Sequence, residues 1–385
     1  MGLDKAHKGY SYQDLLTCYF VLKDILNGNE KSKFSIDKKF IENDRFDDLV
    51  IINGKNIQRK QIKYSEDKEL IKNDFSNDSR DLAIYELFNS WKILKITNSE
   101  FRLCLSWSLS DNKNIRNILK RDENITSSFI SYPTNIYKFD IDNLWDTNSF
   151  IPTSWRKLKE YVEQNSISRD EFKSFCDSLI IELDFPKENH LKEIVLNQII
   201  KLGIGKYPNQ NEQPLNFLER FAKKINDYRG DFNREVSISK VLKDLVVQTE
   251  FGKIEQKFEI DQLKNIKKED KFKTFAKNIE KLKKTILLGE PGSGKSWFLT
   301  NFIEYLEAKK IKVIRHYCFT STNYDVMEEN RVTSDVFFGN LVADIIKKFP
   351  KLKNTKEHLY VADLDELNIL LSHIKEELVI MFRPY

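Results

Sequence analysis

The stretch that most restricts the fold of this chain is GEPGSGKS at residues 289–296. It matches the Walker A pattern G-x-x-x-x-G-K-S, in which glycines let the backbone turn its N–H groups toward phosphate oxygens. In this pattern the lysine places a positive charge beside the β- and γ-phosphates, and the serine hydroxyl ligates magnesium. We therefore predict a nucleotide-binding loop for ATP and Mg²⁺, formed by Gly289, Pro291, Gly292, Ser293, Gly294, Lys295 and Ser296, with Ser296 as the metal ligand.

The residues around this loop predict a βαβ unit. An apolar run at 283–288, KKTILL, is expected as a strand, a helix is expected over 296–309, and a second strand over 311–319. This order implies a parallel sheet with a right-handed crossover connection.

Hydrolysis of ATP needs, in addition, an acidic residue at the end of an apolar strand to orient magnesium and water. The candidate inside the chain is LYVADLDEL at 359–367, with Asp363, Asp365 and Glu366, but its apolar run is short and interrupted. We expect the strand that carries this motif to lie just beyond Tyr385, so the sequence predicts nucleotide binding and leaves hydrolysis open.

Length and composition indicate an ordinary globular protein. The 385 residues suit two or three domains, and the net charge of +4 gives no global field that would indicate nucleic-acid binding. No apolar signal core or membrane-length segment occurs, so we expect a cytoplasmic protein without a membrane partner. Four cysteines lie far apart without zinc spacing and are expected as reduced thiols: Cys18, Cys104, Cys176 and Cys318.

The first 65 residues predict a helix followed by three strands. Apolar spacing indicates a helix over 11–26 with Ser11 as its N-cap, and strands are expected at 33–42, 46–52 and 56–65. The dipeptide Asn53-Gly54 between the last two strands is typical of a two-residue hairpin turn. Later segments predict helices over 80–94 and 215–225 and a strand at 101–107.

The hairpin places candidate metal ligands together. With a turn at Asn53-Gly54, Asp48 opposes Arg59 and Gln61 opposes Phe46, so that Asp48, Gln61 and Lys63 share one face of the sheet. An acid, an amide oxygen and a lysine arranged in this way can bind Mg²⁺ and activate water to attack a phosphodiester.

Two further acids depend on details of this hairpin. Glu42 reaches the same face if the preceding strand continues the sheet, and a turn longer by one residue would replace Asp48 by Asp47. The alternative is that both segments are ordinary strands with polar side chains.

Residues 253–284 carry eleven lysines against six acids, with apolar residues at helical spacing. We interpret this segment as a solvated helical connector between domains. A nucleic-acid contact is the alternative.

The order of these N-terminal motifs resembles the PD-(D/E)xK nuclease superfamily. It is most similar to the double-stranded DNA endonuclease domain of CD-NTase-associated effectors in bacterial antiphage defence, in which Q-x-K replaces E-x-K, as in Mrr-type nucleases. The resemblance implies a restriction-endonuclease-like α/β/α domain over 1–250 that cuts double-stranded DNA. The residues that carry it are Gly9-Tyr10-Ser11-Tyr12-Gln13, Glu42, Asp47-Asp48-Leu49 and Gln61-Ile62-Lys63, with Glu42, Asp48, Gln61 and Lys63 as catalytic residues and Asp48 and Gln61 as metal ligands.

The C-terminal part resembles the STAND ATPases of NACHT-like type found in antiviral Avs proteins. In those proteins the phosphate loop is followed by a strand like residues 313–319 and a helix like residues 337–341. The resemblance implies an incomplete P-loop NTPase α/β domain over 284–385, joined by a connector at 251–283. It also implies homo-oligomerisation on activation and a phage protein trigger that binds a C-terminal region absent here.

Arg315 and His316 lie in the strand that follows the loop helix. They are expected either near the nucleotide or simply at the end of that strand.

The leading hypothesis is a metal-dependent DNA endonuclease controlled by an ATP-binding oligomerisation module. A nucleotide-controlled scaffold with a non-catalytic N-terminal domain is the second hypothesis. A Mrr-like restriction endonuclease that uses its NTPase for translocation is the third.

Overall fold

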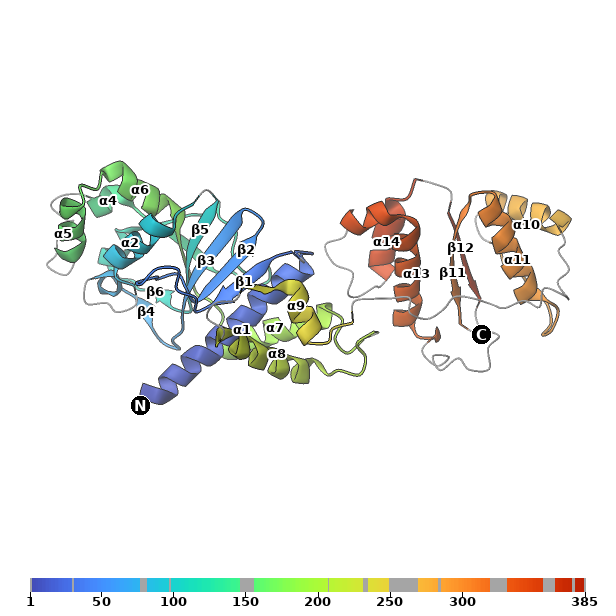
Figure 1. Cartoon of the computed structure of the whole chain (residues 1–385), viewed down its shortest axis with the longest axis horizontal. Coiled ribbons are helices and arrows are strands. Elements are labelled where there is room, and N and C mark those ends of the chain that lie inside the picture. The colour runs from blue at the N-terminus through green and yellow to red at the C-terminus, as the bar shows by residue number, and fades with distance from the viewer. Residues whose placement is uncertain are drawn as a thin grey trace. The chain divides into compact units, whose positions relative to one another are not determined.

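The computed structural model describes residues 2–29, 31–76, 82–96, 98–145, 156–206, 208–230, 235–248, 269–282, 285–318, 331–355, 364–375 and 378–383. The chain separates into two compact units, which we treat individually. Unit 1 comprises Met1–Leu202 and Glu212–Val247, and unit 2 comprises Gly203–Asn211 and Gln248–Tyr385. Both contain helices and strands, so the predicted α/β class is confirmed (Figure 1).

Unit 1 is built on a mixed eight-stranded sheet with the order β10-β1-β2-β3-β5-β9-β8-β7. Strands β3, β5 and β9 are parallel neighbours at its centre, and the remaining pairs are antiparallel. The strands are β1 (Lys33–Ile36), β2 (Leu49–Asn53), β3 (Asn56–Lys63), β5 (Ser99–Leu105), β7 (Leu119–Arg121), β8 (Asn135–Phe139), β9 (Leu179–Leu183) and β10 (Val236–Ser237). The predicted strands in the first 65 residues are thus confirmed with shorter bounds, and the strand predicted at 101–107 is found two residues earlier, at 99–105.

Helices cover both faces of this sheet (Figure 1). One face carries α1 (Gly2–Leu26), α7 (Glu188–Lys201) and α8 (Pro214–Arg229), and the other carries α2 (Ile84–Leu94), α4 (Ile141–Trp145), α5 (Arg156–Gln164) and α6 (Arg169–Ser178). Helix α1 begins at Gly2, so the predicted N-cap at Ser11 is wrong: the helix continues through polar residues before its buried part. The other elements are β4 (Glu69–Leu70), η1 (Lys72–Phe75), β6 (Ser108–Leu109), α3 (Lys113–Arg116) and α9 (Ile238–Asp244).

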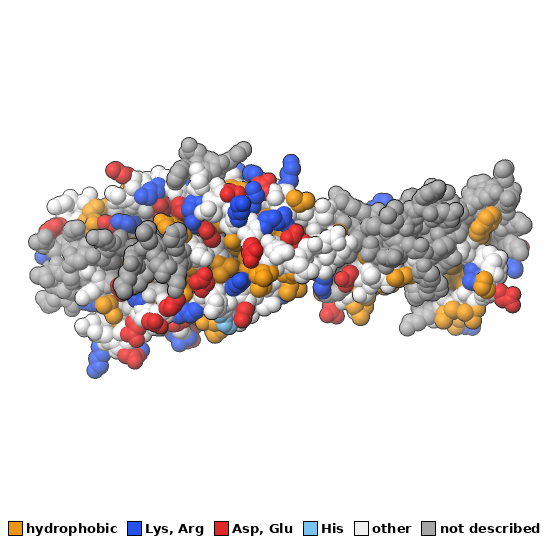
Figure 2. Space-filling view, turned by 90° about the horizontal axis from the view of Figure 1, so that it is seen from below, with side chains coloured by type: hydrophobic (Ala, Val, Ile, Leu, Met, Phe, Trp, Pro, Cys, Tyr) orange, Lys and Arg blue, Asp and Glu red, His pale blue; other side chains and the backbone are white. Residues whose placement is uncertain are grey.

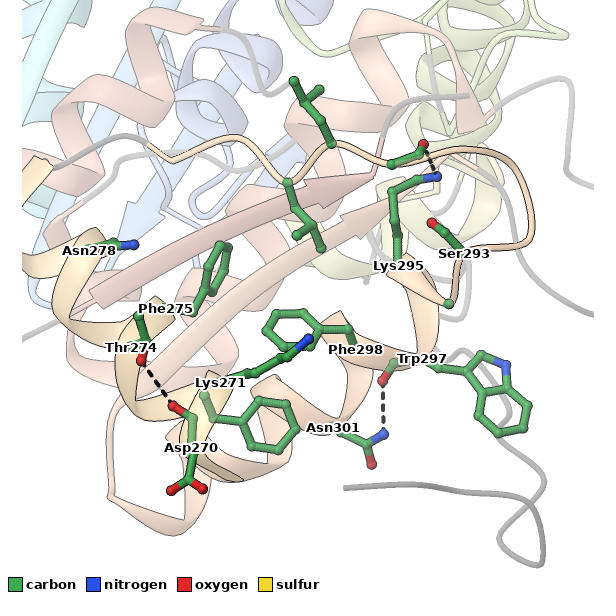
Figure 3. Close-up of a pocket in the computed structure, with 15 residues that line it drawn as sticks. Asp270, Lys271, Thr274, Phe275, Asn278, Ser293, Lys295, Trp297, Phe298 and Asn301 are labelled. Atoms are coloured by element: carbon green, nitrogen blue, oxygen red, sulfur yellow. Dashed lines mark hydrogen bonds between the residues drawn. The ribbon is translucent and has the colours of Figure 1, made fainter. Parts of the chain in front are cut away.

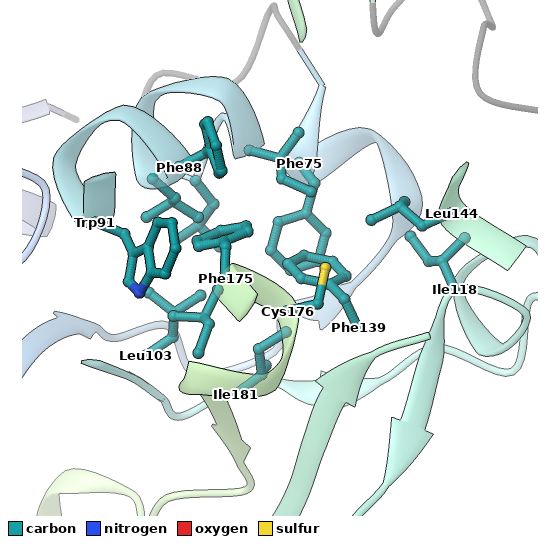
Figure 4. Packing of buried hydrophobic residues seen from close by; sticks show 14 of the residues in the cluster. Phe75, Phe88, Trp91, Leu103, Ile118, Phe139, Leu144, Phe175, Cys176 and Ile181 are labelled. Atoms are coloured by element: carbon teal, nitrogen blue, oxygen red, sulfur yellow. The ribbon is translucent and has the colours of Figure 1, made fainter. Parts of the chain in front are cut away.

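An aromatic cluster holds the α2 side of unit 1 together. Figure 4 shows Phe88, Trp91 and Phe175 gathered between α2 and α6, with Phe75 and Phe139 beside them. The ring centroids of Phe88 and Phe175 lie 5.3 Å apart, nearly perpendicular, which is a favoured aromatic geometry. Each buried ring of this kind stabilises the fold by about 2–3 kcal/mol. The packing of these rings therefore fixes α2 and α6 on one face of the sheet.

Unit 2 has a parallel pair of strands between two layers of helices. Val313 of β11 faces the cluster formed with α10 and α11, whereas its neighbour Ile314 faces the cluster formed with α13 and α14. The elements are α10 (Glu269–Leu282), α11 (Lys295–Ala308), β11 (Lys312–Tyr317), α13 (Ser334–Lys348), η4 (Pro350–Thr355), α14 (Leu364–Ser372) and β12 (Leu378–Arg383), with β11 and β12 paired in parallel. The predicted helix and strand after the phosphate loop are confirmed, but the strand predicted before the loop does not form over 285–288, and the parallel partner of β11 is β12.

Three expectations for unit 2 are corrected. Residues 285–290 form no strand, and Ile286 and Leu288 are 81% and 84% exposed, because no described strand pairs with this segment. In the acidic candidate at 359–367, Asp365 and Glu366 lie in helix α14 and not at the end of a strand, whereas residues 359–363, with Asp363, lie outside the described residues. In the predicted connector at 251–283, the described residues 269–282 form helix α10 as expected, but its apolar side packs against α11 and is not solvated; residues 251–268 lie outside the described residues.

Among the described segments, no helix combines the length and the apolar run that crossing a bilayer requires. The four cysteines are free thiols, three of them buried.

Candidate functional site

The β2–β3 hairpin brings Asp48 and Gln61 to one position on the sheet. In the observed ladder Leu49 pairs with Lys60, so Asp48 stands opposite Gln61. The Gln61 Nε2 donates to Asp48 Oδ2 at 2.6 Å, and the backbone N–H of Ile62 donates to the same oxygen at 2.6 Å. Two hydrogen bonds therefore hold this carboxylate in a single orientation.

The register differs from the prediction by two residues. Asn53 pairs with Asn56, which moves the turn to Gly54-Lys55, with Gly54 at a φ of 62°. The predicted pairings of Asp48 with Arg59 and of Gln61 with Phe46 are therefore wrong. Because side chains alternate with a period of two, a shift of two residues keeps every side chain on its expected face. Asp48 and Gln61 consequently share a face as expected.

Lys63 is the cation of this site. It follows Gln61 by two positions on β3 and so lies on the same face. Burial raises the pKa of Asp37, and the nearby charge of Lys63 acts to lower the pKa values of both Asp37 and Asp48. Burial of the Asp48 carboxylate has the larger effect and raises its pKa to about 7. Near neutral pH, Asp48 is poised between its protonated and charged forms.

Two further acids, Asp37 and Asp14, and their shared partner Arg229 lie near the hairpin, and the sequence did not indicate them. Asp37 follows β1 directly, at a φ of 50°. Gln13 Nε2 donates to its Oδ1 at 3.2 Å, and Arg229 lies 2.6 Å from its Oδ2. Arg229 also pairs with Asp14 at 2.6 Å. These residues come from α1, the β1 end and α8, and no spacing rule in the sequence connects them.

Glu42 is not part of this group in the structure. It is exposed in a turn, and β1 ends at Ile36, so the preceding strand does not continue the sheet as far as Glu42. Asp47 remains beside the site, where burial and Asp44 raise its pKa.

The hairpin offers oxygen ligands for a divalent cation. Among the described residues, no hydrogen bond reaches Oδ1 of Asp48, and the bond from Gln61 Nε2 leaves the amide oxygen as an acceptor. The described residues contain no group of three or more His, Cys, Asp or Glu side chains that could hold a metal ion. One carboxylate and one amide fit Mg²⁺, which keeps several waters and completes its shell with substrate phosphate.

The surface of unit 1 adds no general attraction for DNA on the face shown in Figure 2. There, Lys and Arg side chains are interspersed with Asp and Glu side chains, in accord with the net charge of +4. Recognition of a nucleic acid would therefore depend on the local site.

The phosphate loop of unit 2 has the backbone that its sequence predicts. Gly292 and Gly294 have φ values of 78° and 85°, and α11 begins at Lys295 directly after Gly294. The Lys295 Nζ donates to the carbonyl oxygens of Gly289 at 2.6 Å and Glu290 at 2.8 Å. The loop is therefore folded around its own lysine, and the N-terminus of α11 points its free N–H groups toward the same place.

A cavity of about 750 Å³ adjoins this loop, between α10 and α11 (Figure 3). Phe275 and Phe298 line it, with their ring centroids 5.4 Å apart. Thr274, Asn278 and Asn301 add polar groups. Its size and its mixture of rings and amides suit a nucleoside attached to phosphates on the loop. In the sequence, the helical spacing of Phe272 and Phe275 is the signal that could have indicated the α10 side of this cavity.

The described strands provide no acid for ATP hydrolysis. Strand β12 lies parallel to β11, but the sequence of Leu378–Arg383 contains no Asp or Glu. The expected acidic strand beyond Tyr385 stays a prediction.

His316 has a structural role in unit 2. It is fully buried, its Nε2 lies 2.8 Å from the carbonyl oxygen of Arg331, and its Nδ1 lies 3.4 Å from Nδ2 of Asn340. Burial lowers its pKa, which favours the neutral ring. It thus ties β11 to α13 and is absent from the cavity beside the loop, as is its neighbour Arg315.

Comparison of this chain with protein-family models and with curated proteins gives no match.

Proposed function

We propose that this chain is a metal-dependent DNA endonuclease whose activity is controlled by an ATP-binding module. In this proposal unit 1 is a restriction-endonuclease-like domain and unit 2 is the P-loop NTPase part of a STAND protein in antiphage defence. The observation that carries the proposal is the pairing of Asp48 with Gln61, beside Lys63, on one rigid hairpin.

Each residue of the hairpin has a defined task. Asp48 and Gln61 would hold Mg²⁺ through oxygen atoms, and the bound cation would supply Lewis-acid activation of a phosphodiester and a water molecule. Lys63 would orient the attacking water and stabilise the negative charge that develops on the phosphate. The Ile62 N–H holds Asp48 in place throughout.

The nucleotide would act through unit 2. Phosphates would bind the loop around Lys295, and the base would enter the cavity between α10 and α11. Oligomerisation on ATP binding, triggered by a phage protein, would then bring several nuclease units onto one double-stranded DNA.

Two measurements test this proposal. Incubation of the full-length protein with supercoiled plasmid, Mg²⁺, ATP and a lysate of phage-infected cells as the trigger should give cleavage that Lys63→Ala removes and that Lys55→Ala, in the exposed turn of the same hairpin, leaves intact. Mn²⁺ binding, followed by electron paramagnetic resonance without any trigger, should be weakened at least about tenfold by Asp48→Asn. Undiminished cutting by Lys63→Ala together with unchanged Mn²⁺ binding by Asp48→Asn would contradict the nuclease site.

A nucleotide-controlled scaffold with a non-catalytic unit 1 is the second candidate. The position of Glu42 favours it, because the structure leaves the hairpin without a third oxygen ligand from that residue. In that case Lys63→Ala would leave partner binding intact, whereas Lys295→Ala would abolish it.

A further inference from the structure

A second polar cavity lies on the opposite face of β3 from the hairpin site. It has a volume of about 410 Å³ and opens between α1, the strands β2, β3 and β5, and residues 125–128. Lys60 pairs with Arg102 across the parallel β3–β5 ladder, whereas Gln61 pairs with Leu103, so Lys60 faces away from the hairpin site. Three cations line the cavity: Lys23, Lys60 and Arg102.

Lys60 is the unusual member of this group. It is only 2% exposed, and within the described residues no hydrogen bond or ion pair reaches its ammonium; the ring of Phe20 lies beside it, 4.4 Å from Nζ to the centroid. Burial lowers its pKa. A buried ammonium that has neither a hydrogen bond nor an ion pair destabilises the fold, and a methionine would fill the same space without that penalty. Packing alone therefore does not explain the positive charge of Lys60.

The acids nearby are already engaged by other groups. Arg102 pairs with Glu182 and with Glu100, the latter at 3.0 Å, and its Nη1 donates to Ser128 Oγ at 3.1 Å. Glu182 is fully buried and also accepts from the backbone N–H of Ser128 at 2.7 Å. The attraction of these acids for Lys60 is thus shared with Arg102, and Lys60 itself lines the cavity.

Lys23 and Asp24 of α1 complete the lining. Lys23 Nζ donates to the Ser128 carbonyl oxygen at 2.8 Å, which uses one of its three donors. Asp24 Oδ1 accepts from Asn29 Nδ2 at 3.0 Å, but its buried Oδ2 has no hydrogen-bond partner among the described residues. The cavity thus presents ammonium groups for an anion and a separate carboxylate oxygen for a donor.

The mouth of the cavity carries amide side chains, Asn53, Asn56 and Gln58 among them. Amides offer both donors and acceptors, as the edges of nucleobases do. The volume exceeds what an inorganic phosphate fills and falls in the range of small-ligand sites.

We propose that this cavity binds a mononucleotide, with its phosphate on Lys60 and Lys23 and a hydroxyl or amino group on Asp24. This site is distinct from the phosphate loop and from the hairpin, and it does not depend on nuclease activity.

Calorimetric titration tests the proposal. Every protein carries Lys295→Ala, so that the phosphate loop contributes little, and the probes are dAMP, deoxyadenosine and inorganic phosphate. We expect dAMP to bind, the other two probes to bind at least about tenfold more weakly, and Lys60→Met to lower the dAMP affinity at least about tenfold. Lys120→Met, at an exposed lysine of β7, should leave it unchanged.

Thermal unfolding separates this effect from misfolding. Without ligand, Lys60→Met should melt at or above the temperature of the parent, because it removes a buried unpaired charge, and dAMP should no longer raise that temperature. Lys23→Met is the second variant and should also weaken dAMP binding. Equal dAMP affinity in Lys60→Met and the parent, equal affinity for inorganic phosphate and dAMP, or no dAMP binding at about 1 mM would overturn the proposal.

Discussion

The hairpin of unit 1 and the phosphate loop of unit 2 each depend on one lysine, but they are built in different ways. Asp48 and Gln61 are 13 residues apart in the chain and meet only because the strand register brings them together. The loop is a run of neighbouring residues whose shape follows from two glycines with positive φ. The hairpin site therefore depends on tertiary packing, whereas the loop depends on local backbone conformation.

Their surroundings differ as well. The hairpin side chains are held by short hydrogen bonds inside an eight-stranded sheet. The loop is preceded by residues 285–288, which form no strand and of which Ile286 and Leu288 are exposed, and Lys295 bonds to loop carbonyls. We infer that the hairpin is preorganised for its ligand, while the loop exchanges internal bonds for phosphate contacts. Four experiments can break or sharpen this contrast.

The largest effect is expected from Lys295→Ala. Loss of the only lysine in the loop should weaken ATP binding by about 100-fold, since it removes the cation that would face the phosphates. Binding of a fluorescent ATP analogue measures this, with Lys347→Ala, on the exposed side of α13, as the matched control. Equal affinity in the two variants would show that the loop does not hold the phosphates.

The second-largest effect is expected on the affinity for a divalent cation as the pH changes. Because the pKa of Asp48 is raised to about 7, a divalent cation must displace a proton at lower pH. The affinity for Mn²⁺ should rise about tenfold per pH unit below 7 and level off above it, whereas ATP binding should not follow this curve. A flat Mn²⁺ profile between pH 5 and pH 8 would place the metal elsewhere.

Asp48→Asn should stabilise unit 1 in a pH-dependent way. The folded pKa of about 7 exceeds the unfolded value of 3.8, so the charged form opposes folding, and stability falls as pH rises from 3.8 toward 7. The amide of the Asp48→Asn variant does not ionise, so the stability of the variant does not fall in this way. Its advantage in free energy of unfolding should therefore be about 3–4 kcal/mol larger at pH 8 than at pH 4, by denaturant titration. An advantage that shrinks with rising pH would contradict the assigned burial.

The smallest effect is expected from a substitution in residues 285–288, which precede the phosphate loop. Ile286 is 81% exposed, so Ile286→Thr should change the free energy of unfolding by less than about 0.5 kcal/mol. Val313→Thr, at a fully buried position of β11, is the contrasting substitution and should cost about 1–2 kcal/mol. A comparable loss for Ile286→Thr would show that residues 285–288 pair in a sheet.

Much of the local structure could be predicted from the sequence. Hydrophobic period and turn residues located β2, β3, β5, α8, α11 and β11, because these signals arise from neighbours along the chain. The hairpin was predicted with the turn one residue too early, and the shared face of Asp48 and Gln61 still followed from the period of two.

Other parts could not be predicted, and each failure has a physical cause. Asp365 and Glu366 belonged to an acidic strand candidate at 359–367, but they lie in helix α14, whose Leu367 and Leu370 are buried on one side. The apolar residues before the loop suggested a strand, and a strand forms only where another strand pairs with it.

The sequence by itself determined the phosphate loop, the α/β character and the face on which Asp48, Gln61 and Lys63 lie, because each follows from spacing along the chain. Only the tertiary structure decided that Asp37 and Arg229 surround the hairpin and that Glu42 does not. It also decided that Lys60, one residue from Gln61, is buried on the opposite face beside Lys23 and Arg102. These arrangements depend on which distant segments pack together, and packing is settled by burial of the whole core rather than by any local pattern.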